Sequence, residues 1–194
     1  MARSREGTET KLDLEGPHWQ FALAIYSQPG VADACLMLQD RLGLDINILL
    51  FVTYATTELS MTVTAEDIQA MDAAVQAWRT ETVMPLRALR RRLKQRFGPL
   101  ESEYAEQLRS KVKQTELLAE QIELAMLARW LGQRSGDRAV AEVGLSEVLN
   151  RVIAHFVKGT YITPGADALD LDAAVSTVSR AAKCAKATPI TSSL

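Results

Sequence analysis

The stretch YSQPGVADACLMLQDRLGLDINILLF, residues 26–51, decides the fold. Pro29 disfavours helix at the residue before it and is favoured in the first turn of a helix, so a helix is predicted over 31–42. Gly43 is suited to close that helix, and Asp45 is suited to cap the start of the next one. The stretch therefore predicts two helices joined at a short polar corner.

The second of these helices, over 46–57, carries no charge in its first ten residues, INILLFVTYA. A helix that is apolar on all sides is normally buried, so this one is predicted to be the most buried helix of an all-α protein. Apolar residues at intervals of three and four predict further helices on both sides. One begins at Pro17, and another, over 66–97, begins with a capping box formed by Thr64 and Asp67.

Pro85 lies inside the predicted helix over 66–97. A proline there removes one backbone hydrogen bond and clashes with the preceding turn, which predicts a kink near 81–85 rather than a break. The apolar stripe of this helix places Trp78 in the core against the uncharged helix. The next helix, over 102–133, is expected to return antiparallel to it.

The C-terminal third has weaker patterns. A helix is predicted over 140–157 with Gly159 closing it, and an alanine-rich helix follows Leu171, capped by the acidic residues at 170–172. Because the apolar face of this last helix is narrow, a truncation at Gly159 is expected to keep cooperative folding. The fold is predicted to be a compact all-α bundle of about seven helices. Its predicted parts are a flexible N-terminal arm over 1–14, a helical domain over 15–159, and a connector, amphipathic helix and polar tail over 160–194.

Composition limits the class of protein. The 194 residues are 47% apolar and 24% charged, which indicates one globular domain. The formal net charge of −2 argues against nucleic-acid binding as a global property. The longest apolar run, Ile46–Tyr54, is about half of the ~18 residues that a membrane-spanning helix needs. The start of the chain has charges of both signs and no apolar segment, so a cytoplasmic location is expected.

Cofactor chemistry has no support in the sequence. Cys35 and Cys184 lack the spacing of a metal site, and Cys35 is predicted to be a small core residue. Helical di-metal sites add a Glu-x-x-His motif, and His18 and His155 occur in no such context. No metal or cofactor is therefore predicted. No P-loop, nucleophile elbow or HExxH motif is present, and whether the protein is an enzyme stays open.

The polar corner offers candidate binding residues. Gln39 and Asp40 fall in the last turn of their helix, where exposed carbonyls disfavour an acid unless a cation or donor compensates it. Asn47 lies in the first turn of the next helix. These groups either tie the corner together or hold a ligand, and the structural interpretation is favoured over the ligand site.

The basic run RALRRRLKQR, residues 87–96, contains no acid. If the two long helices form an antiparallel hairpin, an intramolecular lattice of ion pairs is the simplest interpretation. A nucleic-acid surface is disfavoured because no aromatic residues alternate with the basic ones. This register puts Arg96 opposite Glu103, Arg92 near Glu106, and Arg79 opposite Glu120. It puts Glu116 opposite Val83 and about one helical turn from Arg87, close enough for an ion pair that braces the kink.

Three segments carry a resemblance: PGV-x-x-x-C-L-x-LQD-x-x-G-x-D-I-N-x-LLF, then W-x6-PLR-x-LR, and ELLAE at 116–120. Together they resemble a proteobacterial family of small uncharacterised helical proteins over residues 17–127, which implies a helical domain and no established activity. The chain departs from the family in having VTYA after LLF, where the family has a Trp-containing segment, and in a longer C-terminal part from about residue 135. The matching positions are Pro29, Gly30, Leu38, Gln39, Asp40, Gly43, Asp45, Asn47, Trp78, Pro85, Leu86, Arg87, Arg90, Glu116 and Glu120.

Two classes of function follow. The first is a non-enzymatic binding or adaptor protein that docks another protein, or a copy of itself, through a helical surface, and the lack of a catalytic motif favours it. The alternative is a small-ligand-binding protein or enzyme with a polar pocket between the joint at 39–47 and the kink at Pro85. The candidate ligand-binding residues are Gln39, Asp40, Asn47, Arg87, Arg90, Glu116 and Glu120.

Overall fold

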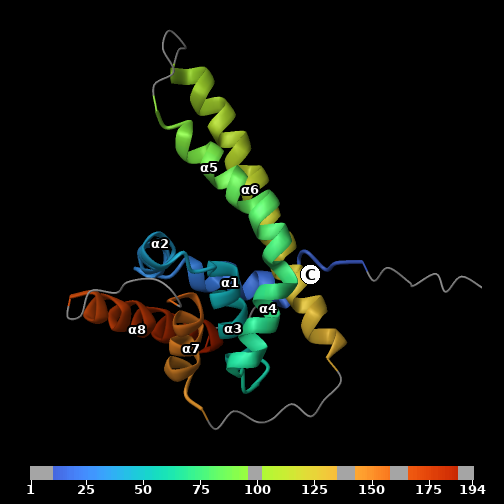
Figure 1. Cartoon of the computed structure of the whole chain (residues 1–194), viewed down its shortest axis with the longest axis vertical. Coiled ribbons are helices and arrows are strands. Elements are labelled where there is room, and N and C mark those ends of the chain that lie inside the picture. Colours follow the sequence, from blue (N-terminus) through green and yellow to red (C-terminus); the bar gives the residue numbers. More distant parts are fainter. Residues whose placement is uncertain (1–10, 96–101, 135–142, 158–165, 188–194) are drawn as a thin grey trace, which may run out of the picture.

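The computed structural model describes residues 11–95, 102–134, 143–157 and 166–187, and within these ranges it contains helices and connecting loops but no strand. The all-α prediction is confirmed, and α4, η1 and α5 form one continuous rod (Figure 1). The elements are α1 (Pro17–Tyr26), α2 (Val31–Leu42), α3 (Ile46–Thr57), α4 (Ala65–Trp78), the π-helical turn η1 (Arg79–Val83), α5 (Met84–Arg92), α6 (Ser102–Gln133), α7 (Leu145–Val157) and α8 (Ala166–Ala187).

The helix α3 forms the centre of the core, as the sequence predicts. The Asp45 carboxylate accepts the backbone N–H groups of Asn47 and Ile48 at its start, and every residue from Asn47 to Ala55 is buried. α3 packs against α1, α4, α6, α7 and α8. Gly43 closes α2 with a φ of 63°, a left-handed conformation that favours glycine.

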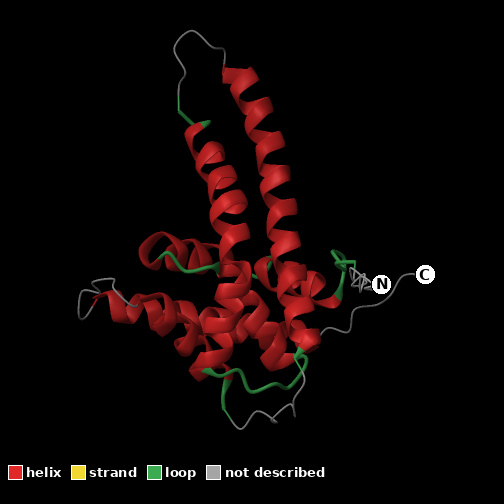
Figure 2. Ribbon diagram, turned by 45° about the vertical axis from the view of Figure 1, so that its right-hand side comes forward, coloured by secondary structure: helices red, strands yellow, loops and turns green. Residues whose placement is uncertain are grey.

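The rod formed by α4, η1 and α5 runs antiparallel to α6 (Figure 2). At the predicted kink the chain forms η1, in which the N–H of Met84 bonds to the carbonyl of Arg79, five residues back. This wider turn puts Pro85 in the first turn of α5, where a missing N–H is tolerated. α5 ends at Arg92, and residues 93–95 are not helical. The predicted extension of this helix to residue 97 is therefore wrong for residues 93–95, and residues 96 and 97 lie outside the described ranges.

α5 and residues 102–118 of α6 extend away from the other helices, and we call them the projecting hairpin (Figures 1 and 2). The remaining described helices form the body. Trp78 lies near the junction of the two, and it is half-buried rather than in the core. Its indole N–H donates to the carbonyl of Ala119 in α6 at 2.9 Å, so the predicted core placement of this side chain is wrong.

The C-terminal helices differ from their predicted bounds. α7 begins at Leu145 rather than near residue 140, and Gly159 lies outside the described residues. α8 already begins at Ala166, so the acidic pair at 170 and 172 lies inside the helix instead of capping it, and Asp170 pairs with Arg41 of α2 at 2.7 Å.

α8 also completes the core. Its buried residues belong to the same apolar cluster as α3, and α8 packs against α1, α2, α3 and α7. Small side chains bring α8 close to α2, so a narrow apolar face still fills the space between helices. The buried residues are Ala174, Val175, Val178, Ser179, Ala181 and Ala182.

No single helix among the described residues is long and apolar enough to cross a membrane. α1 and α2 together reach the length and composition of a span, but they are bent by 98° at the break between them.

Candidate functional site

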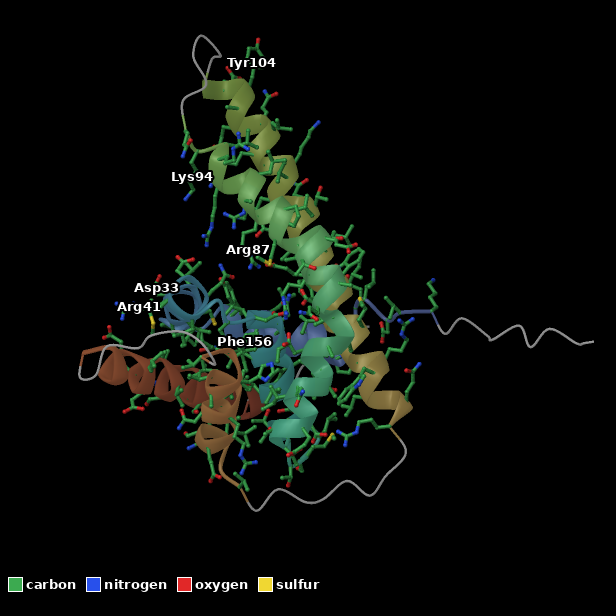
Figure 3. All side chains as sticks on the ribbon, in the orientation of Figure 1. Asp33, Arg41, Arg87, Lys94, Tyr104 and Phe156 are labelled. Atoms are coloured by element: carbon green, nitrogen blue, oxygen red, sulfur yellow. The ribbon has the colours of Figure 1, made fainter. Side chains whose placement is uncertain are left out.

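A pocket of about 380 Å³ lies where the projecting hairpin meets the body. Figure 3 shows Arg87 at this junction. The larger apolar side chains that line the pocket are Trp19, Leu23, Leu36, Ile46, Leu50, Leu117 and Leu124. Its polar lining consists of Tyr26, Gln39, Asn47, Arg87, Arg90, Lys113, Glu116 and Glu120.

The pocket brings together six of the seven candidate ligand-binding residues. These are Gln39, Asn47, Arg87, Arg90, Glu116 and Glu120. Asp40 is outside it: the side chain is exposed, and its carboxylate pairs with Arg91 of α5 at 2.6 Å. An acid in the last turn of a helix requires a cation, and here the hairpin supplies it.

Four of the pocket residues form an ion-pair cluster between α5 and α6. Arg87 Nε donates to Glu116 Oε1 at 3.1 Å, and Arg87 Nη2 donates to Glu120 Oε1 at 2.6 Å. Arg90 Nη2 donates to Glu116 Oε1 at 3.1 Å, and Arg90 Nε donates to Glu116 Oε2. Both oxygens of the buried Glu116 are therefore occupied by arginines. The structure thus contains the Arg87–Glu116 pair that the hairpin register predicts.

Burial and charge oppose each other within this cluster. Burial disfavours the charged form of Arg87, but Glu120 and Glu116 outweigh that effect and raise its pKa. Burial also raises the pKa of Glu120, although Arg87 counteracts it. Of the two acids, Glu120 is therefore held in a site that disfavours its charge.

The local sequence explains why these groups meet. Arg87 and Arg90 are three residues apart on α5, and Glu116 and Glu120 are four apart on α6, so each pair shares one face of its helix. The π turn η1 lies directly before α5. Because a π turn holds an extra residue per turn, it changes which side of the following helix faces α6.

Two other predicted pairs of the hairpin are absent among the described residues. Arg79 does not face Glu120; it pairs with Asp45 and Asp72, at 2.7 and 2.6 Å. Glu106 pairs with Arg109 of its own helix rather than with Arg92. Arg96 lies outside the described residues. The predicted Arg79–Glu120 and Arg92–Glu106 pairs are therefore wrong, because closer acids and cations take their place, and the predicted Arg96–Glu103 pair is untested.

Glu123 is a buried acid next to the pocket that sequence reasoning missed. Its side chain is completely buried, and Glu123 Oε2 accepts the Nδ2 group of Asn47 at 2.7 Å. Burial, reinforced by the neighbouring Asp45 carboxylate, raises the pKa of Glu123 to about 9, so it is a neutral acid at pH 7. A signal was present in the sequence: Glu123 is seven residues from Glu116 and returns to the same helix face.

A chain of polar contacts continues from this acid toward α7. Asp45 and Asp72 share Arg79, and His155 Nε2 lies 2.8 Å from Asp72 Oδ2. The Arg79 guanidinium lies over the Phe156 ring at 5.8 Å. These contacts hold α4, η1 and α7 against the start of α3. They give the buried Asp45 carboxylate at the start of α3 a cationic partner.

Cys35 lies at the apolar side of the pocket and is buried, as predicted. Burial raises the pKa of its thiol to about 12, so the nucleophilic thiolate is not populated at neutral pH. Among the described residues, no group of three or more His, Cys, Asp or Glu side chains is placed to hold a metal ion.

Comparison with known proteins identifies the family of this chain. No curated protein and no solved structure matches the chain. A family model matches residues 17–127, more than half of the chain. This segment holds every residue that lines the pocket, whereas α7 and α8 lie beyond it. The chain belongs to the family described as "Protein of unknown function (DUF2390)".

Proposed function

We propose that this protein is a non-enzymatic binding protein that docks a protein chain along its projecting hairpin, with a second copy of itself as the partner. One observation carries the proposal: all nine exposed large apolar side chains of the described residues lie on the hairpin or line the pocket at its base. They are Leu23, Tyr26, Leu36, Met84, Leu89, Tyr104, Leu108, Leu117 and Leu118.

The hairpin lacks a substantial core of its own. α5 has no buried residue, and Val112 is one of the few buried apolar residues on the facing part of α6. On α6, Tyr104, Leu108 and Leu118 share one exposed face, which also carries Lys111 and Thr115 between the leucines, and we call these three side chains the apolar stripe. Two helices can bury each other on one side only, so another helical pair is needed to cover this stripe.

The charges of the hairpin suit a second copy. The end of α5 and the residues after it expose basic groups, including Arg91, Arg92 and Lys94, while the start of α6 exposes Glu103 and Glu106. Figure 3 shows Lys94 and Tyr104 near the tip. In a two-fold dimer with parallel hairpins, α5 of one protomer lies beside α6 of the other, and the basic and acidic ends meet.

Sedimentation velocity over a concentration series tests the proposal. Wild-type protein is expected to shift from the 21.4 kDa chain mass to twice that mass as concentration rises. Leu108→Lys places a charge in the apolar stripe and should keep the protein monomeric.

Ser110→Lys is the matched control. Ser110 is also exposed on α6 but faces away from Leu108, so this variant should dimerise like the wild type. A wild-type monomer at every concentration excludes a second copy as the partner. A dimer that survives Leu108→Lys excludes the hairpin stripe as its interface.

A further inference from the structure

We propose that the pocket between the hairpin and the body binds a small monocarboxylate with an aliphatic body. The carboxylate is held by Arg87, Arg90 and Lys113, and the aliphatic part lies against the leucines of α1, α2 and α6. This site is separate from the apolar stripe of the hairpin. It involves a small molecule rather than a protein chain.

The charge balance of the pocket favours an anion. Three cations, Arg87, Arg90 and Lys113, line it together with two acids, Glu116 and Glu120. Lys113 is exposed and makes no ion pair with any residue that the structure describes. A ligand carboxylate would supply the missing negative charge next to Lys113.

The arginines also keep hydrogen-bond donors. A guanidinium has five N–H groups, and the Glu contacts of Arg87 and Arg90 use only Nε and Nη2 of each. The acids are fewer than the cations, and only Glu120 keeps an oxygen without an arginine contact. Both Glu116 oxygens accept arginine N–H groups, and Arg87 occupies one oxygen of Glu120. An amine is therefore the poorer occupant.

The apolar side of the pocket selects the rest of the ligand. Leu23, Leu36 and Leu117 are exposed although they line a cavity, so an aliphatic group placed there would remove them from water. The volume of about 380 Å³ lies near the lower end of the range for small-molecule sites, which suits a short acyl chain rather than a peptide.

A purely structural role, in which the ion pairs only brace the hairpin, explains fewer features of the pocket than ligand binding does. Ion pairs between α5 and α6 account for Arg87, Arg90, Glu116 and Glu120, because all four lie on these two helices. They do not account for Lys113, or for the open apolar space that α1 and α2 contribute. A ligand with a carboxylate and an aliphatic body accounts for both.

Isothermal titration calorimetry with octanoate, using the full chain, tests the inference. Octanoate is expected to bind with 1:1 stoichiometry, and octylammonium and octanol should each bind at least about tenfold more weakly because they lack the anion. Lys113→Gln should weaken octanoate binding about threefold to tenfold.

Lys111→Gln is the matched control, because Lys111 is an exposed lysine on the same helix that does not line the pocket. Its octanoate affinity should equal that of the wild type. The inference is overturned if octanoate does not bind at millimolar concentration. It is equally overturned if octylammonium or octanol binds as tightly, or if the two lysine variants weaken binding to the same degree.

Discussion

The body and the projecting hairpin are built on different physical principles. In the body, α3 is buried from Asn47 to Ala55 and other helices surround it, so hydrophobic burial holds it in place. In the hairpin, α5 has no buried residue, and its contacts with α6 depend largely on ion pairs around Glu116. Burial gives the body its stability, whereas the hairpin leaves apolar and charged groups available for binding.

The largest effect is expected from removing α8. The apolar pattern of the sequence predicts that a chain ending at Gly159 still folds cooperatively. The packing of α8 predicts the opposite result, because Val175, Val178 and Ala182 fill the core beside α2 and α3. Thermal melts of the truncated chain followed by circular dichroism decide between the two, and a sharp transition close to that of the full chain would support the domain boundary at residue 159.

The next prediction compares one aromatic residue from each region. Phe51→Ala in α3 should lower the free energy of unfolding by about 3 to 5 kcal/mol, because a completely buried ring is lost. Tyr104→Ala near the hairpin tip should change it by less than about 0.5 kcal/mol, because that ring is 58% exposed. Urea unfolding of the monomer measures both. Similar losses in the two variants would mean that the hairpin has a core of its own.

The ion pairs of the hairpin are tested at Glu116. Glu116→Ala should lower the free energy of unfolding by about 2 to 4 kcal/mol, because it leaves two partly buried arginines without their shared partner. As a control, Glu106→Ala removes an exposed carboxylate, 63% accessible, and should cost under about 0.5 kcal/mol. If Glu116→Ala were as mild as its control, ion pairing could not be what holds α5 to α6.

Glu123 connects stability to pH. Its pKa is raised from 4.5 to about 9 by burial, so folding takes up a proton between these pH values. Below about pH 4.5 Glu123 is protonated in both the folded and the unfolded chain, and its full contribution to the free energy of unfolding is present. That contribution is lost as pH rises through about 9. The free energy of unfolding should therefore fall with pH by up to about 1.4 kcal/mol per unit in this window.

Glu123→Gln mimics the neutral acid and isolates this effect. The amide can still accept the Asn47 N–H, so the variant should be more stable than wild type at pH 8, with a flatter pH dependence. Chemical denaturation at pH 5, 6.5 and 8 measures the slope. Parallel pH profiles for variant and wild type would place the titration elsewhere.

The smallest effects compare the two aspartates of the polar corner. Asp45→Ala should cost about 1 to 2 kcal/mol, because the start of α3 loses its cap and Arg79 loses a partner. Asp40→Asn should stay within about 0.5 kcal/mol, because the Asp40–Arg91 pair is about half exposed on both sides. Denaturant melts of both variants provide the measurement. A clear destabilisation by Asp40→Asn would show that this exposed pair anchors the hairpin to the body.

The sequence by itself determined the features that depend on neighbouring residues. Pro29, Gly43 and Asp45 mark the ends of α2 and the start of α3, because capping and backbone preference act within one turn. The pairing of Arg87 with Glu116 also followed from sequence, since a hairpin between two long helices allows few registers. Six of the seven candidate binding residues could be placed near one junction on that basis, as the lining of a polar pocket predicted between the joint at 39–47 and the kink at Pro85.

Only the tertiary structure decided which side chains are buried and what they meet. Trp78 has the spacing of a core residue but lies half-buried against Ala119, and Arg79 pairs with Asp45 because the start of α3 packs beside it. The small residues of α8 look weak as an apolar pattern yet fill the core, since burial depends on the helices that approach them. Glu123 illustrates both sides: spacing puts it on the same helix face as Glu116, but its burial and its raised pKa come from helices distant in sequence.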